Sequence, residues 1–231
     1  AETLKTLLPP ENVVDPDAMT NLSKRHRDLV REGLRFDTGS VIAEQRATDE
    51  TRKLLIEWQD EADATALPVL GSRPDRQTEC VMIPTERRRT ACVSSQVGCP
   101  VGCTFCASGL GGLDGNLTAG RIVEQVHRLG RLESGRITNV VFMGMGEPLA
   151  NYGAVTDAIR TLTAPWGLHI SARRITVSTV GLPAAIRRLA GFERPITLAL
   201  SLHAPTDELR RELIPWAEYA TIDELVDACD T

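Results

Sequence analysis

The chain has 231 residues, of which 42% are hydrophobic and 25% charged, and its formal net charge is -5. This balance is that of an ordinary globular protein, and no apolar run reaches the ~18 residues of a membrane-spanning helix. The mild acidic excess does not exclude a nucleic-acid partner, because basic residues are clustered locally, as in the run Arg87–Arg89 just before a cysteine-rich region.

Cysteine usage points to a reducing compartment. Six cysteines are present, and three of them, Cys99, Cys103 and Cys106, fall close together. A chain long enough to bury its own core needs no disulfide staples. Closely spaced cysteines in such a chain favour a metal or cluster site, so we expect a cytoplasmic protein with reduced thiols.

Residues 1–85 are predicted to form a small accessory region of one helix and several β-strands. Its expected elements, in chain order, are a helix over 19–33, two strands within 40–59 around a turn at 47–51, a loop over 61–76 and a strand over 78–84.

Residues 86–231 alternate between strand-like and helix-like runs, which predicts a second domain of the α/β class. The expected strands are 91–97, 139–144, 174–179 and 196–202, and the expected helices are 117–130, 151–163, 183–191, 206–213 and 221–230. Four strand–helix units in series imply a parallel sheet with helices on its outer face, curling toward a barrel or a doubly wound sheet. In both forms, chemistry gathers in the loops after the strands.

The first of these loops contains the pattern C-x3-C-x2-C, formed by Cys99, Cys103 and Cys106. Thiolates are the natural ligands of iron–sulfur clusters, and three thiolates on a cubane cluster leave one iron open to a small chelating ligand. Gly98 and Gly102 would let the backbone wrap closely around an inorganic core. The pattern therefore predicts an iron–sulfur site.

Two other interpretations of these cysteines stay open. Structural zinc would need a fourth ligand, and the nearest downstream histidine is His127, within a predicted helix. Buried structural thiols are the second alternative, which the regular spacing disfavours.

The cysteine pattern, with the aromatic Phe105 before its last cysteine, resembles that of the radical S-adenosylmethionine (SAM) superfamily. The resemblance implies a partial (βα)6 barrel, incomplete here with about four βα units. It also implies a 4Fe–4S cluster whose open iron binds SAM. Reductive cleavage of SAM then gives a radical that abstracts hydrogen.

Further segments resemble the RlmN/Cfr family of radical SAM RNA adenine methyltransferases. They are Cys92–Cys99, Asn116–Thr118, Phe142–Leu149, Val177–Thr179 and Ser201–Pro205. The resemblance implies methylation of an adenine ring carbon in 23S rRNA, and in some members in tRNA. It also implies an electron donor such as flavodoxin or ferredoxin, no membrane partner and a monomeric enzyme.

The resemblance assigns roles to residues at the strand ends. Cys99, Cys103 and Cys106 would bind the cluster. Gly146 and Glu147 would meet the SAM amino group, where a carboxylate facing an ammonium is favourable. The remaining SAM-binding positions that it implies are Phe105, beside the adenine, and Ser178, Ser201, Leu202 and His203.

Two catalytic roles are also implied. Cys92 matches the family cysteine that takes a proton from the adenine ring and then closes a disulfide with the methyl-carrying cysteine. Glu79 matches a family glutamate proposed as an acid–base group. A buried strand thiol and a solvent-facing strand glutamate are the respective alternatives.

The family's methyl-carrier cysteine is expected beyond this chain. Cys229 is not that residue, because its predicted helix, 221–230, follows the fourth strand region directly, as in the family. The last barrel strands and much of an N-terminal helical domain are also expected to be missing, so the sequence describes a fragment or a shortened relative.

Methylation at adenine carbon 2, as in the RlmN type, is the favoured function. The Cfr type, which methylates carbon 8, is the close alternative. A different radical SAM enzyme, such as a glycyl-radical activase, and a non-catalytic cluster- or zinc-binding module are the others.

Overall fold

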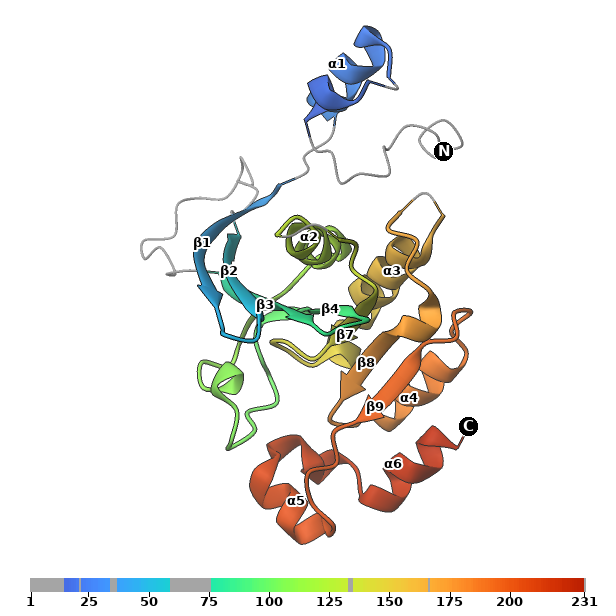
Figure 1. The fold of residues 1–231 in the computed structure, drawn as a ribbon. Coiled ribbons are helices and arrows are strands. Elements are labelled where there is room, and N and C mark those ends of the chain that lie inside the picture. Colours follow the sequence, from blue (N-terminus) through green and yellow to red (C-terminus); the bar gives the residue numbers. More distant parts are fainter. Residues whose placement is uncertain are drawn as a thin grey trace, which may run out of the picture.

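The computed structural model describes residues 15–20, 22–33, 37–58, 76–132, 135–165 and 167–230. Most of the loop predicted over 61–76 lies outside these residues. Within them, the chain forms one large mixed sheet, a small two-stranded sheet, and helices packed on one side (Figure 1).

The large sheet has seven strands in the order β1-β2-β3-β4-β7-β8-β9. The strands are β1 (Gly39–Arg46), β2 (Arg52–Trp58), β3 (Gln77–Pro84), β4 (Arg89–Cys92), β7 (Asn139–Phe142), β8 (Ile175–Thr179) and β9 (Thr197–Leu200). From β4 to β9 neighbouring strands run parallel, whereas β1 to β4 pair antiparallel. The predicted parallel sheet of an α/β fold is confirmed.

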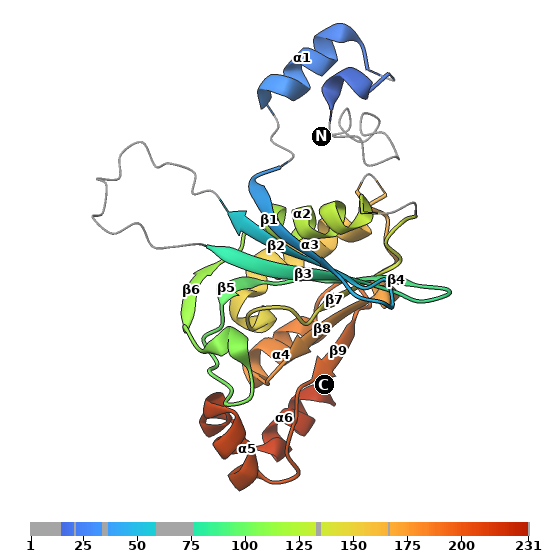
Figure 2. The same ribbon diagram turned by 60° about the vertical axis from the view of Figure 1, so that its left-hand side comes forward.

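Helices cover one face of the parallel strands, as Figures 1 and 2 show from two directions. They are α2 (Ala119–Gly130), α3 (Tyr152–Thr163) and α4 (Pro183–Ala190). Strand side chains alternate between burial and partial exposure; in β8, for example, Ile175 and Val177 are fully buried. The buried set packs against these helices and forms the main core. No described helix is long and apolar enough to cross a bilayer.

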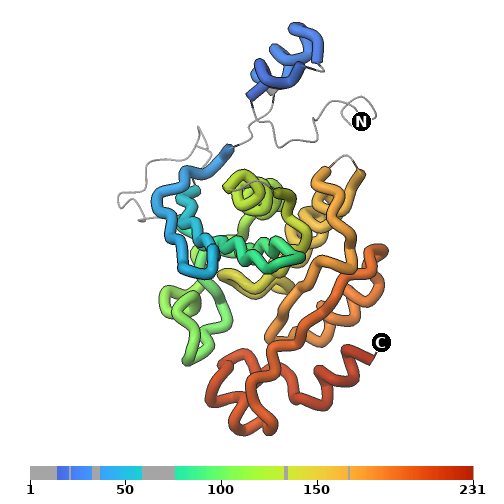
Figure 3. The backbone as a smooth tube through the Cα atoms, viewed as in Figure 1, coloured from blue at the N-terminus to red at the C-terminus, as the bar shows by residue number. Residues whose placement is uncertain are grey.

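Three further helices follow β9 and lie at the lower end of the tube in Figure 3. They are α5 (Asp207–Leu213), the short η6 (Pro215–Tyr219) and α6 (Ile222–Cys229). The side chain of Thr221 and that of Glu224 form a reciprocal capping box at the start of α6. Local sequence signals therefore suffice to start this helix.

The predicted accessory strands join the same sheet as the parallel ones, since β3 pairs with β4. The division of the chain at residue 85 therefore remains a prediction. Before these strands lies α1 (Lys24–Gly33), which packs with η2 (Pro16–Ala18) around Met19, Leu22 and Val30. The helix begins at Lys24, later than predicted, and the Ser23 hydroxyl just before it accepts the N–H of His26 at 3.3 Å.

The single strand predicted over 91–97 is wrong. Strand β4 ends at Cys92, and β5 (Gln96–Gly98) belongs to a separate two-stranded sheet with β6 (Leu113–Asn116), a strand that was not predicted. Ser94 causes the break. Its N–H donates to Gln125 of α2 at 2.8 Å, and its hydroxyl donates to the carbonyl of Glu79 at 2.6 Å. These bonds turn the chain out of the large sheet toward the cysteine loop.

A buried carboxylate joins α2 to the start of β1. Glu124 is 6% exposed and accepts hydrogen bonds from the backbone N–H groups of Thr38 and Gly39 and from the Thr38 hydroxyl. Arg128, one turn later, donates to the same carboxylate at 2.8 Å. The antiparallel strands are thereby fixed to the helix that covers the parallel ones.

Glu124→Ala should lower the free energy of unfolding by about 3 kcal/mol, because it removes the acceptor of two backbone N–H groups and one carboxylate partner of the mostly buried Arg128. Urea unfolding followed by circular dichroism measures this. Glu193→Ala is the matched control, since its ion pair with Arg160 is exposed and should contribute little. Equal losses in the two variants would contradict the account.

Candidate functional site

The cysteine loop begins where β5 ends and is closed by glycines. Gly98 has φ +72° and Gly102 has φ +70°, backbone conformations that favour glycine. A Cβ added at Gly98 would lie 2.0 Å from the carbonyl oxygen of Gly112. The N–H of Cys99 donates to that same carbonyl at 3.0 Å. The backbone therefore doubles back on itself at the first cysteine, as the glycine positions indicate.

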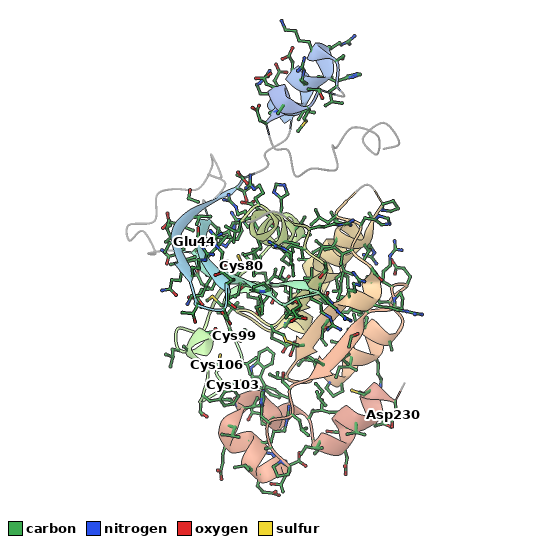
Figure 4. All side chains as sticks on the ribbon, viewed as in Figure 1. Glu44, Cys80, Cys99, Cys103, Cys106 and Asp230 are labelled. Atoms are coloured by element: carbon green, nitrogen blue, oxygen red, sulfur yellow. The ribbon has the colours of Figure 1, made fainter. Side chains whose placement is uncertain are left out.

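Figure 4 shows Cys99, Cys103 and Cys106 together in this loop, with Cys80 apart in the large sheet. All three loop thiols are free and partly buried. Burial raises the pKa of Cys99 and of Cys103, and the neighbouring cysteines raise it further. A cationic core would offset both effects at Cys99 and Cys103, because positive charge stabilises thiolates.

Thiolates are the usual ligands of iron–sulfur clusters, so the three cysteines of this loop could hold one. Among the described residues, no group of three or more His, Cys, Asp or Glu side chains is arranged to hold a single metal ion. Neither Cys80, buried in the sheet core, nor Cys229, exposed on α6, belongs to this loop.

The strand register brings the predicted catalytic residues to one face of the sheet. Val81 pairs with Cys92 across β3 and β4, and Ser178 pairs with Ala199 across β8 and β9. In β3, β4 and β8, the residues just before and after these positions are buried on the helix side of the sheet. The paired residues themselves therefore point to the opposite side, which we call the open face. The predicted residues on the open face are Glu79, Cys92, Ser178 and Ser201.

Contacts on the open face define the setting of each predicted residue. The Ser178 and Ser201 hydroxyl oxygens lie 2.9 Å apart, which links the ends of β8 and β9. Glu79 accepts a hydrogen bond from Lys53 at 2.9 Å. Burial raises the pKa of Cys92, an effect that a hydrogen bond with the Met143 backbone partly offsets. Cys92 is therefore a protonated thiol at neutral pH unless a base lies nearby.

Glu147 is buried, which its sequence position after a predicted strand does not indicate. It is 2% exposed, and its carboxylate accepts the N–H groups of Leu149 and Val180, each at 2.9 Å. Burial raises the pKa of Glu147, and these two N–H groups oppose the shift. The preceding Gly146 has φ +100°, and a Cβ there would meet Gln96 at 2.6 Å. Glu147 thus joins the loops after β7 and β8, and its contact with SAM remains a prediction.

Aromatic rings link the cysteine loop to the end of β9. Phe105, 55% exposed, meets His203 edge-on with ring centroids 5.0 Å apart. His203 has φ +61°, an uncommon conformation for a residue other than glycine. Leu202, also predicted in the site, lies just before it and is partly buried.

Support for the loop from α5 and η6 was not predicted. The N–H of Thr104 donates to the carbonyl of Leu213 at 3.0 Å. Val101, between the first two cysteines, is buried against Ile214 and Ala217. The buried apolar positions around the Leu213–Ala217 segment were visible in the sequence, but their partner more than a hundred residues earlier was not.

Comparison with known proteins agrees with this arrangement. The family model described as "Radical SAM superfamily" matches residues 93–230. The chain is 44% identical over 219 residues to the "Dual-specificity RNA methyltransferase RlmN" of Halorhodospira halophila, covering 94% of this chain and 57% of the relative. It is 46% identical over 224 residues to the "Probable dual-specificity RNA methyltransferase RlmN" of Mycolicibacterium vanbaalenii, with the same coverage of each.

A solved structure agrees as well. The crystal structure of a radical SAM methyltransferase from Sphaerobacter thermophilus superposes with a TM-score of 0.83 at 42% sequence identity, covering 94% of this chain and 61% of that one. The chain therefore spans a little over half the length of the relatives that it matches. The match over 93–230, which includes the cysteine loop and the ends of the parallel strands, shows that the chain belongs to the radical SAM superfamily.

Proposed function

We propose that this chain is the core of an RlmN-type radical SAM enzyme that methylates carbon 2 of an adenine ring in 23S rRNA, and also in tRNA. The observation that carries the proposal is the loop of Cys99, Cys103 and Cys106 beside an open sheet face with Cys92 and Glu79. The similarity to proteins named as dual-specificity RNA methyltransferases supports it.

In this proposal, Cys99, Cys103 and Cys106 hold a 4Fe–4S cluster. Such a cluster would supply the electron for the reductive cleavage of SAM and hence the radical chemistry. Ser178, Ser201 and the ring of Phe105 bind and orient SAM. A low-potential electron carrier such as flavodoxin or ferredoxin delivers the electron, and the enzyme acts as a monomer.

Cys92 and Glu79 act on the RNA in this proposal. Cys92, on the open face, would act as a thiolate and take the proton from the adenine carbon of the covalent protein–RNA adduct. After losing that proton, it would attack the sulfur of the methyl-carrier cysteine. The S–S bond would form as the bond from that sulfur to the transferred carbon breaks, and this carbon would take up a proton to become the methyl group. Because burial raises the pKa of Cys92, the thiol needs a neighbouring base before it can act. Glu79, with Lys53 as its partner, lies on the same face of the adjacent strand and exchanges protons with the adenine.

Product mapping on RNA tests the proposed activity. The protein as encoded by its gene is incubated anaerobically with SAM, a reductant and either 23S rRNA or tRNA, and the nucleosides are analysed by mass spectrometry. We expect 2-methyladenosine, absent with a Cys92→Ala variant. Formation of 8-methyladenosine would establish the Cfr type instead. SAM cleavage without any methylated adenine would contradict a methyltransferase.

Ser201→Ala should weaken SAM binding about tenfold without changing the iron content, because it removes one hydrogen-bonding hydroxyl from the proposed pocket. Anaerobic calorimetric titration of the cluster-loaded protein with SAM measures the dissociation constant. Ser171→Ala is the control, since Ser171 is exposed and its side chain makes no capping bond. An unchanged dissociation constant for Ser201→Ala would remove this residue from the pocket.

A further inference from the structure

A buried arginine lies beneath the cysteine loop. Arg210 of α5 is 1% exposed and is the one lysine or arginine among the fully buried residues that the structure describes. Its guanidinium donates to the carbonyl of Val180. Its Nε is buried without a hydrogen-bond partner, and no carboxylate of the described residues pairs with it. A buried cation is costly unless opposite charge lies near it, and a negative charge held by the cysteine loop would lower that cost.

The helix that carries Arg210 docks directly on the cysteine loop. Leu213, at the end of this helix, accepts the N–H of Thr104. Val180, which accepts from Arg210, packs with Cys99 and Cys103 around the small apolar cluster of Val101, Ile214 and Ala217. Val180 therefore lies between the guanidinium of Arg210 and the apolar cluster on which Cys99 and Cys103 pack.

Two acidic groups act on Arg210. Burial lowers the pKa of Arg210, while Asp207 and the Cys103 thiolate raise it. Asp207 keeps its negative charge although it accepts the N–H of Ile222 at 2.8 Å, so it compensates Arg210 in part. Arginine stays protonated under all ordinary conditions, so its positive charge is permanent. A negative charge held by the cysteine loop would compensate it further.

The charge of a filled cysteine loop has the right sign. Three thiolates carry more negative charge than the core of an oxidised cubane carries positive charge, so the filled site is anionic. One-electron reduction makes it more anionic. Net charge and nearby charges are among the factors that set the reduction potential of such clusters.

We propose that Arg210 is a positioning residue whose buried positive charge compensates the thiolate-bound cluster and raises its reduction potential. The inference rests on the proposed cluster site. The step concerned is the transfer of one electron from a one-electron reductant to the cluster, with no bond formed or broken and no proton moved. The fixed cation favours the reduced form, because that form carries the extra negative charge.

The test compares three substitutions in the cluster-loaded protein. Arg210→Gln removes the charge but keeps a donor for the Val180 carbonyl, whereas Arg210→Lys keeps the charge. Arg211→Gln removes an exposed charge from the same helix. Each protein is titrated anaerobically with dithionite in the presence of redox mediators. The reduced cluster is followed by electron paramagnetic resonance, and iron per chain is measured separately.

At a fixed solution potential, Arg210→Gln should lower the ratio of reduced to oxidised cluster at least tenfold, which is about 59 mV for a one-electron couple. Arg210→Lys should restore most of that ratio, and Arg211→Gln should leave it unchanged. Loss of the cluster from Arg210→Gln but not from Arg210→Lys would also support the proposal that the positive charge of Arg210 compensates the cluster.

An unchanged ratio in Arg210→Gln, or an equal fall in the Gln and Lys variants, would overturn the inference. So would loss of the cluster from both variants of Arg210, which would make this residue a purely structural support for the loop. Failure of the unaltered protein to bind a cluster would instead overturn the proposed function itself.

Discussion

The carboxylate of Glu147 holds the site end of the sheet together. It accepts the N–H groups of Leu149 and Val180, and so joins the loops that follow β7 and β8. The carbonyl oxygen of Val180 in turn accepts a hydrogen bond from the guanidinium of Arg210. One residue, Val180, thereby connects a buried anion to a buried cation through the two polar groups of its own backbone. The positions of the strand ends, of α5 and of the cysteine loop all depend on this connection.

The charges around this connection suit an inorganic cluster. The loop thiols are partly buried, and burial together with the negative charge of neighbouring cysteines raises the pKa of Cys99 and of Cys103. A cationic core reverses both effects by supplying opposite charge at the thiolates. The backbone is shaped for such a core by Gly98 and Gly102, both with positive φ. The side chains and the backbone of the loop are thus both suited to binding an iron–sulfur cluster.

The sequence was sufficient where signals are local or periodic. The alternation of strands and helices predicted the parallel sheet, Pro183 begins α4 as expected, and Thr221 caps α6. The strand-end position of Ser178 and Ser201 was also foreseen, and their hydroxyl groups are in contact. Their contact with SAM stays a prediction.

The sequence did not predict structural features that depend on contacts between residues far apart in the chain. Residues 91–97 read as one strand, but Ser94 leaves the ladder because it binds Gln125 of α2 and the carbonyl of Glu79. The burial of Arg210 was not visible in the mostly charged segment Asp207–Arg211, because its partner Val180 is thirty residues away in the chain. Such contacts depend on how the helices pack on the sheet, and the residue pattern within one segment does not determine this packing.

The central claim is that the cysteine loop holds a cluster with an open iron that cleaves SAM. Anaerobic reconstitution with iron and sulfide, reduction with dithionite and measurement of 5′-deoxyadenosine from SAM test it most directly. The account predicts about four irons per chain and SAM cleavage, both lost in Cys103→Ala and both retained in Cys229→Ala. A bound cluster without cleavage, or equal cleavage by the Cys103→Ala protein, would contradict it.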